Sequence, residues 1–185
     1  MAAAHGHIDH HTDKRIALLI SVLALVLAFS ETLGNATQTS ALSANIEATN
    51  LWSFYQAKAA RQAILNTAAE LLEAQAGGVP AEAARKQAEK WRQTAARYQS
   101  DAATREGRAE LGERAKQVEA RRDRALAAYH NYEIASAAVQ IAVVLASASI
   151  ITETMALAWI AGALGLAGAA LCVIGFWFPT AVHML

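Results

Sequence analysis

The sequence predicts an all-α integral membrane protein with three transmembrane helices and a long helical-hairpin (coiled-coil-like) insert between the first and the second. The first observation is charge segregation. Residues 16–50 and 134–185 contain only three acidic side chains and no Lys or Arg, whereas 14 of the 16 Lys and Arg residues lie between Lys58 and Arg124. The second observation is that long apolar runs occupy these charge-poor regions. The third is that only two prolines and no strand-like alternation leave the helix as the regular structure.

The overall composition excludes some classes of partner. The chain carries 16 basic and 16 acidic side chains, so it has no net field that would attract nucleic acid. Its single cysteine, Cys172, lies inside an apolar run and leaves no disulfide within one chain.

The first predicted span covers residues 16–34 and follows a His-rich tail at 1–15. Its apolar run of 14 residues extends to 18 with Ser30–Leu33, which gives a helix of about 27 Å, close to one hydrocarbon core. Lys14 and Arg15 before the run also resemble the start of a signal peptide, with "GNA" at 34–36 as a cleavage site. We expect an uncleaved anchor, because the helical pattern continues beyond the run.

A second apolar block, 134–178, is long enough for two spans and is divided by the polar turn Thr152-Glu153-Thr154. It is followed by a short tail at 179–185. Small residues recur every fourth position in each half, which allows close packing of helices in lipid. These predicted packing residues are Ala138, Ala142, Ala146, Ala161, Gly165 and Ala169. Trp159, Phe176 and Trp177 lie near the ends of the spans, as interfacial aromatics do.

A line of residues in alternating steps of four and three runs from Ile16 to Leu72, and only Lys58 and Gln62 on it are neither apolar nor small. We call this line the seam. It predicts one helix that leaves the membrane and continues with a heptad period. We expect a kink at Gly34. The seam residues that we expect at a subunit or arm interface are Ser30, Gly34, Thr37, Ala41, Ala44, Ala48, Leu51, Tyr55, Lys58, Gln62 and Leu65.

The insert, 35–133, is predicted to be a helical hairpin with its tip at 77–80, where "GGVP" stops the first helix. On the return arm, Ala84, Ala88, Trp91, Ala95, Tyr98 and Ala102 repeat the same steps. Measured from residue 78, the return arm is 56 residues long against 45 for the outgoing arm, an excess of about 16 Å. We therefore expect a break near Gly107 or Gly112.

The stretch "NLWSFYQAK" at 50–58 gathers three aromatics and a lysine, and its signature residues are Trp52, Phe54, Tyr55, Gln56, Ala57 and Lys58. With the His-rich start, the early span and the final hairpin, it resembles a bacterial family of unknown function, the one numbered four-three-three-seven. The resemblance covers the whole chain and implies an inner-membrane protein with a long helical insert. It brings no activity. Family members commonly carry Lys or Arg in the final turn, where this chain has Thr152-Glu153-Thr154.

Polar residues within the apolar pattern are the candidate functional groups. Lys58 on the seam requires a carboxylate partner, with Glu89, Glu106 and Glu110 available on the return arm. The alternatives are that Lys58 and Gln62 set the subunit number or line an aqueous path. Glu31 and Glu153 lie at span ends, where an interfacial role competes with ion handling. Arg121, Arg122 and Arg124 favour either anionic lipid or ion pairs with Glu119 and Asp123.

No metal site or cofactor is predicted. His5, His7, His10 and His11 are weak metal candidates, because their spacing matches no closed site and the tail is expected to be solvated.

We predict that the chain is not an enzyme, since it contains no nucleophile set, phosphate loop or metal box. One hypothesis is a membrane scaffold or interaction protein that self-associates through its long first helix. The alternative is a homo-oligomeric channel or transport component, with a path lined by small polar residues of that helix. Expected partners are membrane lipid, further copies of the chain and another membrane or envelope protein, but no nucleic acid. The expected location is the bacterial inner membrane, with a cytoplasmic N-terminus and a periplasmic insert.

Overall fold

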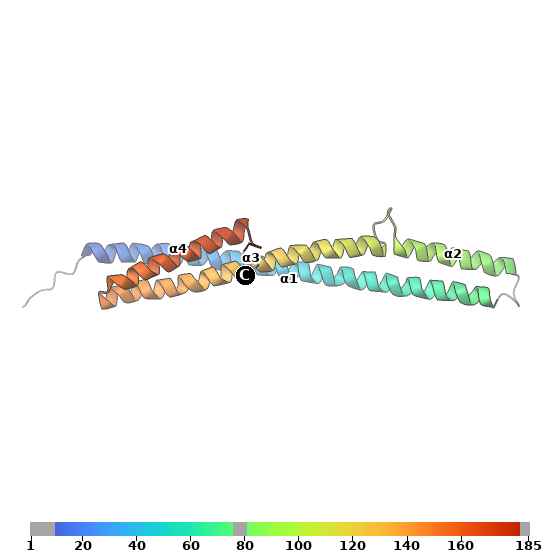
Figure 1. The fold of residues 1–185 in the computed structure, drawn as a ribbon, viewed down its shortest axis with the longest axis horizontal. Coiled ribbons are helices and arrows are strands. Elements are labelled where there is room, and N and C mark those ends of the chain that lie inside the picture. Colours follow the sequence, from blue (N-terminus) through green and yellow to red (C-terminus); the bar gives the residue numbers. More distant parts are fainter. Residues whose placement is uncertain (1–9, 76–80, 182–185) are drawn as a thin grey trace, which may run out of the picture. The chain divides into compact units, whose positions relative to one another are not determined.

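The computed structural model describes residues 10–75 and 81–181, which form four helices and, within those ranges, no strand. They are α1 (His10–Ala74), α2 (Ala81–Gln99), α3 (Arg108–Thr152) and α4 (Met155–Trp177) (Figure 1). The prediction of an all-α chain is confirmed. Within the described residues, α1, α3 and α4 are long and apolar enough to cross a membrane.

Helix α1 runs for 65 residues without a break. It contains no proline and one glycine, and it is rich in alanine and leucine, which are strong helix formers. Gly34, expected as a kink, is buried within the continuous helix, where an added Cβ would lie 3.6 Å from the Cβ of Tyr132. The predicted hairpin tip at 77–80 lies outside the described residues.

The helix of the return arm is interrupted near the position expected from the excess length of that arm. Helix α2 ends at Gln99 and α3 begins at Arg108, so Gly107 lies in the connection and Gly112 inside α3. A Cβ at Gly107 would come within 2.5 Å of the Ser100 Cα and 2.6 Å of the Asp101 nitrogen. Only glycine therefore permits this close return of the chain. Ala102, predicted to continue the buried rhythm of the return arm, is instead exposed in this connection.

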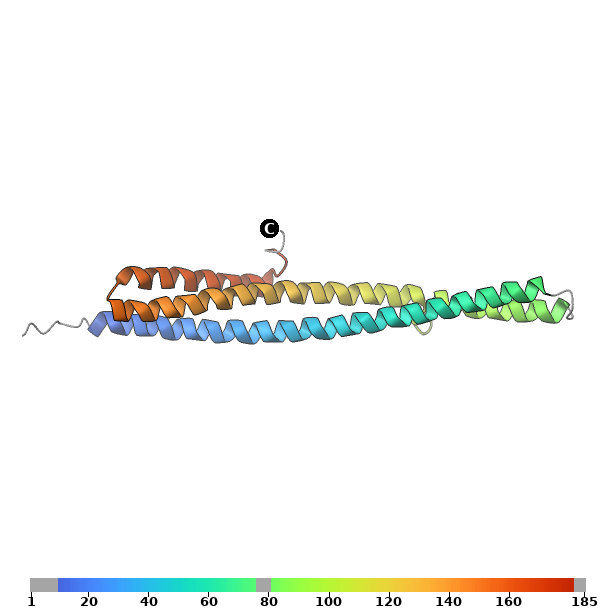
Figure 2. The same cartoon turned by 90° about the horizontal axis from the view of Figure 1, so that it is seen from below.

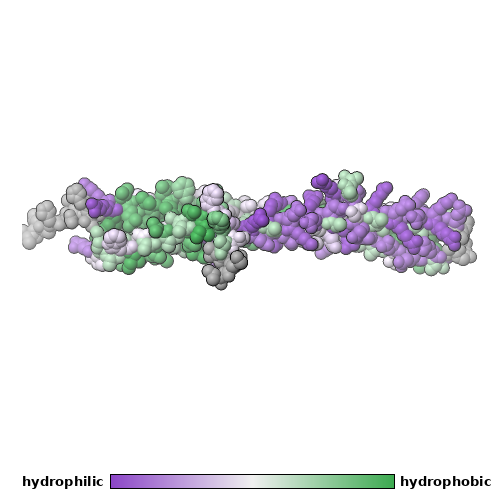
Figure 3. All heavy atoms as spheres, turned by 45° about the horizontal axis from the view of Figure 1, so that its top comes forward, coloured by the Kyte–Doolittle hydropathy of each residue, from purple (hydrophilic) through white to green (hydrophobic). Residues whose placement is uncertain are grey.

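The chain divides into two compact units, residues 1–41 with 123–185 (unit 1) and residues 42–122 (unit 2). In unit 1, α4 lies beside α3 and the first part of α1 (Figures 1 and 2). Its core joins all three helices through Ile16, Leu23, Val139, Ala142, Ala146 and Ala161. Only 17 to 28% of the most apolar window of each helix is buried, so most of the apolar surface points outward (Figure 3).

The turn between α3 and α4 lies at the predicted dividing tripeptide. Helix α3 ends at Thr152 and α4 begins at Met155, and Glu153 turns the chain with a φ of 51°. At the other end of α4, the Asn131 side-chain amide donates to the Pro179 carbonyl oxygen at 3.1 Å. This bond links the end of the helical hairpin back to α3.

Unit 2 packs the second part of α1 against α2 and the beginning of α3. One core cluster contains Ala44, Ala48, Leu51, Leu111, Ala115 and Val118, with Trp52 and Tyr55 beside it. Towards α2, the buried residues are all alanines: Ala69, Ala84, Ala88 and Ala95. Because alanine buries little apolar area, polar contacts between the helices carry a larger share of the specificity.

Candidate functional site

The signature residues of α1 divide between an inner and an outer side. Trp52 is half-buried, and its indole N–H donates to Glu119 Oε1 at 2.9 Å. Tyr55 and Lys58 are also half-buried, whereas Gln56 and Ala57 are exposed and Phe54 is 62% exposed. Trp52, which lies off the seam, thus covers the returning helix α3, while Phe54 faces away from it.

Arg108, the first residue of α3, gathers the polar side chains of this region. Its guanidinium donates to the Tyr55 hydroxyl at 3.0 Å, to Gln62 Oε1 at 2.8 Å and to Gln99 Oε1 at 3.3 Å. Its Cζ lies 4.7 Å from the centroid of the Tyr55 ring, within range of a cation–π interaction. The buried Nε atom has no hydrogen-bond partner among the described residues. Arg108 therefore ties α1, α2 and α3 together, a role that the sequence did not reveal.

Lys58 is paired with one of the three acids considered for it. Its Nζ lies 3.6 Å from Glu106 Oε2 and 5.9 Å from the centroid of the Tyr98 ring. The Lys58 side chain is 19% exposed and that of Glu106 66% exposed. The position of the Tyr98 ring beside Lys58 agrees with an antiparallel match of the two arms about residue 78.

The connection between α2 and α3 is held by its own carboxylates. Asp101 accepts from the backbone N–H groups of Ala103 and Thr104, and hydrogen bonds from Thr104 are the main cause that lowers its pKa. Glu110 accepts from the Ser100 hydroxyl, which is the main cause that lowers the pKa of that carboxyl. These hydrogen bonds hold the connection that leads to Glu106 and Arg108.

Every seam position from Ile16 to Leu72 is buried or half-buried. Ser30 is fully buried and donates to the Tyr132 carbonyl oxygen at 2.8 Å, while Thr37 donates to the carbonyl oxygens of Leu33 and Gly34. Further along, Gln62 accepts from Arg108, and Leu65 is half-buried. Through Ser30 and Gln62, the seam contacts α3 of the same chain.

The small residues of the C-terminal helices pack largely as their spacing indicates. Ala142, Ala146, Ala161 and Gly165 are buried, and Ala138 and Ala169 are half-buried. The four-residue pattern missed Val139, which is fully buried, and Gly168, whose close neighbours are Val139 and Ala135. Sequence spacing identified the helix faces but not which residues on each face meet.

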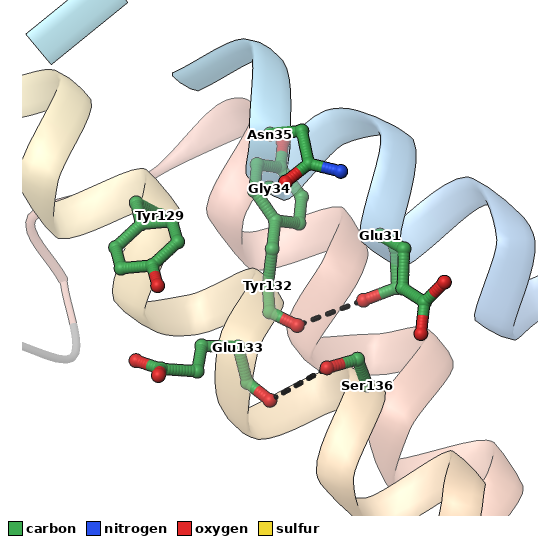
Figure 4. A pocket seen from close by; sticks show the side chains of 8 residues that line it. Glu31, Gly34, Asn35, Tyr129, Tyr132, Glu133 and Ser136 are labelled. Atoms are coloured by element: carbon green, nitrogen blue, oxygen red, sulfur yellow. Dashed lines mark hydrogen bonds between the residues drawn. The ribbon is translucent and has the colours of Figure 1, made fainter. Parts of the chain in front are cut away.

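A groove of about 270 Å³ in unit 1 is lined by α1 and α3 (Figure 4). Its lining residues are Ser30, Glu31, Gly34, Asn35, Tyr129, Tyr132, Glu133 and Ser136. Glu31 accepts a hydrogen bond from the Gln140 amide at 3.3 Å, and Ser136 donates to the Glu133 carbonyl oxygen. The carboxylates of Glu31 and Glu133 point to opposite sides in Figure 4 and therefore do not converge on a common ligand.

The remaining candidate residues do not form a reactive centre in the described part of the chain. Arg121 pairs with Glu47 at 2.9 Å, whereas Glu119, one of its expected partners, accepts from Trp52. Glu153 is exposed in the turn. The side chains of His5, His7, His10 and His11 lie outside the described residues. Elsewhere in the described ranges, no three His, Cys, Asp or Glu side chains gather as a metal site would require.

Comparison with known proteins identifies a family and nothing beyond it. No curated protein and no solved structure matches the chain significantly. Residues 12–178 match the family described as "Domain of unknown function (DUF4337)". This match confirms the family that the signature suggested, and the chain belongs to the DUF4337 family.

Proposed function

We propose that this protein is a non-enzymatic integral membrane protein that self-associates and acts as a scaffold or interaction protein. The proposal rests on the contacts that the polar signature residues make within the chain. Trp52 and Tyr55 are hydrogen-bonded to α3, and Lys58 pairs with Glu106 in the connection between α2 and α3. Groups used in this way hold helices in register instead of facing a substrate.

Further ion pairs have the same character. Arg92 makes two hydrogen bonds to Glu73, at 2.7 and 2.8 Å, which join α2 to α1. The Arg121–Glu47 pair joins α3 to α1. Bidentate ion pairs and ion pairs between helices fix the relative positions of the helices more than they add to stability. A scaffold that presents a surface to a partner requires such rigidity.

The apolar helices of unit 1 support insertion into a membrane, because most of their apolar surface is uncovered. We propose the bacterial inner membrane, with residues 42–122 on the periplasmic side. Lys14 and Arg15 precede the first apolar run and favour a cytoplasmic N-terminus. A reporter that is active only in the periplasm, fused within residues 76–80, should be active. Activity of a cytoplasm-only reporter at the same site would reverse the orientation.

Self-association is tested by counting copies of the purified chain in lipid nanodiscs by mass photometry. Two or three copies are expected, because a scaffold closes its interface by packing. A single copy at all protein concentrations would overturn the proposal.

The channel alternative ranks second. Its path was expected along small polar residues of the first helix, but the Ser30 and Thr37 hydroxyls donate to backbone carbonyls of the same chain. A ring of five or more copies, together with ion flux in proteoliposomes, would favour the channel over the scaffold.

A further inference from the structure

Helix α1 carries a second ordered line of residues within unit 2, on the side away from the seam. It advances by alternating steps of three and four and consists of Ser43, Ile46, Asn50, Ser53, Ala57, Ala60, Ile64, Thr67 and Leu71. We call this line the outer stripe. Each of its positions lies two residues beyond a seam position, from Ala41 to Ala69, which is a rotation of about 200° around the helix. The outer stripe therefore lies opposite the buried interface.

All positions of the outer stripe are exposed and none is charged. Three of them are large apolar residues that a helix in water would not gain from exposing: Ile46 (55% exposed), Ile64 (66%) and Leu71 (56%). Between Ile46 and Ile64 the stripe is mainly small, with Ala57 at its centre. An exposed, uncharged line at heptad spacing, with large apolar residues towards both ends and small residues between them that permit close approach, is typical of one half of a helix–helix interface.

We propose that the outer stripe is the surface through which two copies of this chain associate, α1 against α1. The inference rests on the proposed self-association and names its surface. The absence of charge favours a second copy as the occupant. A two-fold interface brings each residue close to its own counterpart, so a charged stripe would repel itself, whereas this one does not. Exposed faces of α2 and α3, in contrast, carry many charges, such as Lys86, Lys90 and Arg114.

Asn50 supports a parallel pairing in register. In the heptad of the outer stripe, one position, equivalent to the first core position of a coiled coil, is occupied by Ser43, Asn50, Ala57, Ile64 and Leu71. A single Asn at such a position typically favours two parallel strands in one register, because each amide finds the other. Two copies inserted in one membrane in the same orientation run parallel, which agrees with this preference.

The size of the stripe indicates how the dimer is maintained. From Ser43 to Leu71 it is about 42 Å long and about 10 Å wide, a footprint of roughly 400 Å² on each copy. Over both copies this amounts to about 800 Å², which is less than the roughly 1,200 Å² that a stable specific interface buries. The dimer therefore depends on the membrane, which holds two chains at a high effective concentration.

The test uses the full chain in nanodiscs and places charge at the centre of the stripe. Ala57→Glu puts two carboxylates against each other in the dimer, and about a tenfold or larger loss of dimer is expected. Both residues are good helix formers and position 57 is exposed, so the fold of the single chain is retained. Ala120→Glu, at an exposed alanine of α3, is the matched control and should leave the dimer intact.

A charge swap makes the test specific. Mixing the Ala57→Glu and Ala57→Lys variants should restore a heterodimer, because the opposite charges now face each other. In a Cys172→Ser background, Ala57→Cys should form a disulfide-linked dimer under mild oxidation, while Ala120→Cys should not.

The outcomes separate this inference from the proposed function. A dimer that survives Ala57→Glu and does not cross-link through Ala57→Cys overturns the outer stripe and leaves self-association through another surface. If the unsubstituted chain is monomeric, both the outer-stripe interface and the proposed self-association are overturned. The outer stripe would then be a binding surface for a different protein. Loss of the dimer with Ala57→Glu, rescued by Ala57→Lys, supports both.

Discussion

The ammonium of Lys58 lies 3.6 Å from the carboxylate of Glu106, and the two partners differ sharply in their surroundings. Lys58 is sheltered beneath the Tyr98 ring, whereas Glu106 stands two-thirds exposed at the end of the α2–α3 connection. The pair is therefore a half-buried cation with a solvated partner. Removing the lysine leaves no buried carboxylate behind, so the large penalty of a stranded charge does not apply.

Replacement of Lys58 should accordingly have small effects. Lys58→Met keeps the apolar stem and should leave the thermal stability unchanged or slightly higher. Lys58→Ala should lower the free energy of unfolding by about 1 kcal/mol or less, through the lost pair and lost packing of the stem. Thermal unfolding in detergent measures both. Lys86→Met, in an exposed pair with Glu82, is the control. A loss above about 3 kcal/mol for Lys58→Ala would mean that the pair is desolvated after all.

Arg108 should matter more than Lys58, because it serves three acceptors on two other helices. Arg108→Lys keeps the charge but loses the planar fork, and should lower stability by about 1–2 kcal/mol. Tyr55→Phe removes one acceptor and should cost about 1 kcal/mol. Tyr98→Phe, which keeps the ring beside Lys58, is the matched control. Fully additive effects of Tyr55→Phe and Arg108→Lys would show that the hydrogen bond contributes nothing.

Much of this architecture follows from residue spacing. The seam from Ile16 to Leu72 could be predicted because the helical repeat alone decides which residues share a face. The break before Arg108 could be predicted because two arms that meet at one tip must match in length. The dividing turn at Thr152–Thr154 followed from the loss of hydropathy there.

The remaining features depend on tertiary contacts that spacing does not specify. Glu106, instead of Glu89 or Glu110, meets Lys58 because the 100–107 connection folds back on Gly107. Ser30 finds its acceptor on Tyr132, 102 residues away. Burial of the seam by the chain's own arms, and exposure of the opposite stripe, likewise required the three-dimensional arrangement.

Acid should weaken the α2–α3 connection. The pKa values of Asp101 and Glu110 are lowered from their ordinary values of 3.8 and 4.5 by hydrogen bonds to the ionised forms. A carboxyl with a lowered pKa in the folded state stabilises the fold above its unfolded pKa. That stabilisation is lost as the pH falls from about 4.5 through the lower folded value. The melting temperature should therefore fall between pH 5 and pH 3.

The Glu110→Gln variant isolates one contribution to this pH dependence. At pH 7 it should melt below the unmodified chain, and the difference should shrink as the pH falls through the lowered folded pKa of Glu110, below which both side chains are neutral. Glu82→Gln, at an exposed residue of α2, is the control. A difference that stays constant from pH 7 to pH 3 would show that the Ser100–Glu110 bond does not favour the ionised carboxyl.

Two glycines of α4 should respond in opposite ways to the same substitution. At Gly168, an added Cβ would lie 2.5 Å from Val139 Cγ2 and 3.1 Å from the Ala135 carbonyl oxygen, and both neighbours are fully buried. Gly168→Ala should therefore lower stability by roughly 1–3 kcal/mol through overpacking against α3. At Gly162, nothing lies within 4 Å of an added Cβ. Gly162→Ala should raise stability by up to about 1 kcal/mol, because alanine favours the helix.

The cause of the Gly168 effect can be tested by creating space opposite it. Val139→Ala alone removes two buried methyl groups and should be destabilising, since it leaves a cavity between α3 and α4. Combined with Gly168→Ala, it removes Val139 Cγ2, the atom with which the new Cβ would clash. The double variant should therefore be more stable than the sum of the two single effects predicts, with a coupling of about 1 kcal/mol. Thermal unfolding in detergent, followed by circular dichroism, gives the stability of the unmodified chain, the two single variants and the double variant. Additive effects would indicate that Gly168 is required for something other than its approach to Val139. Equal melting temperatures of the Gly162→Ala and Gly168→Ala variants would contradict the close packing of α4 on α3 at Gly168.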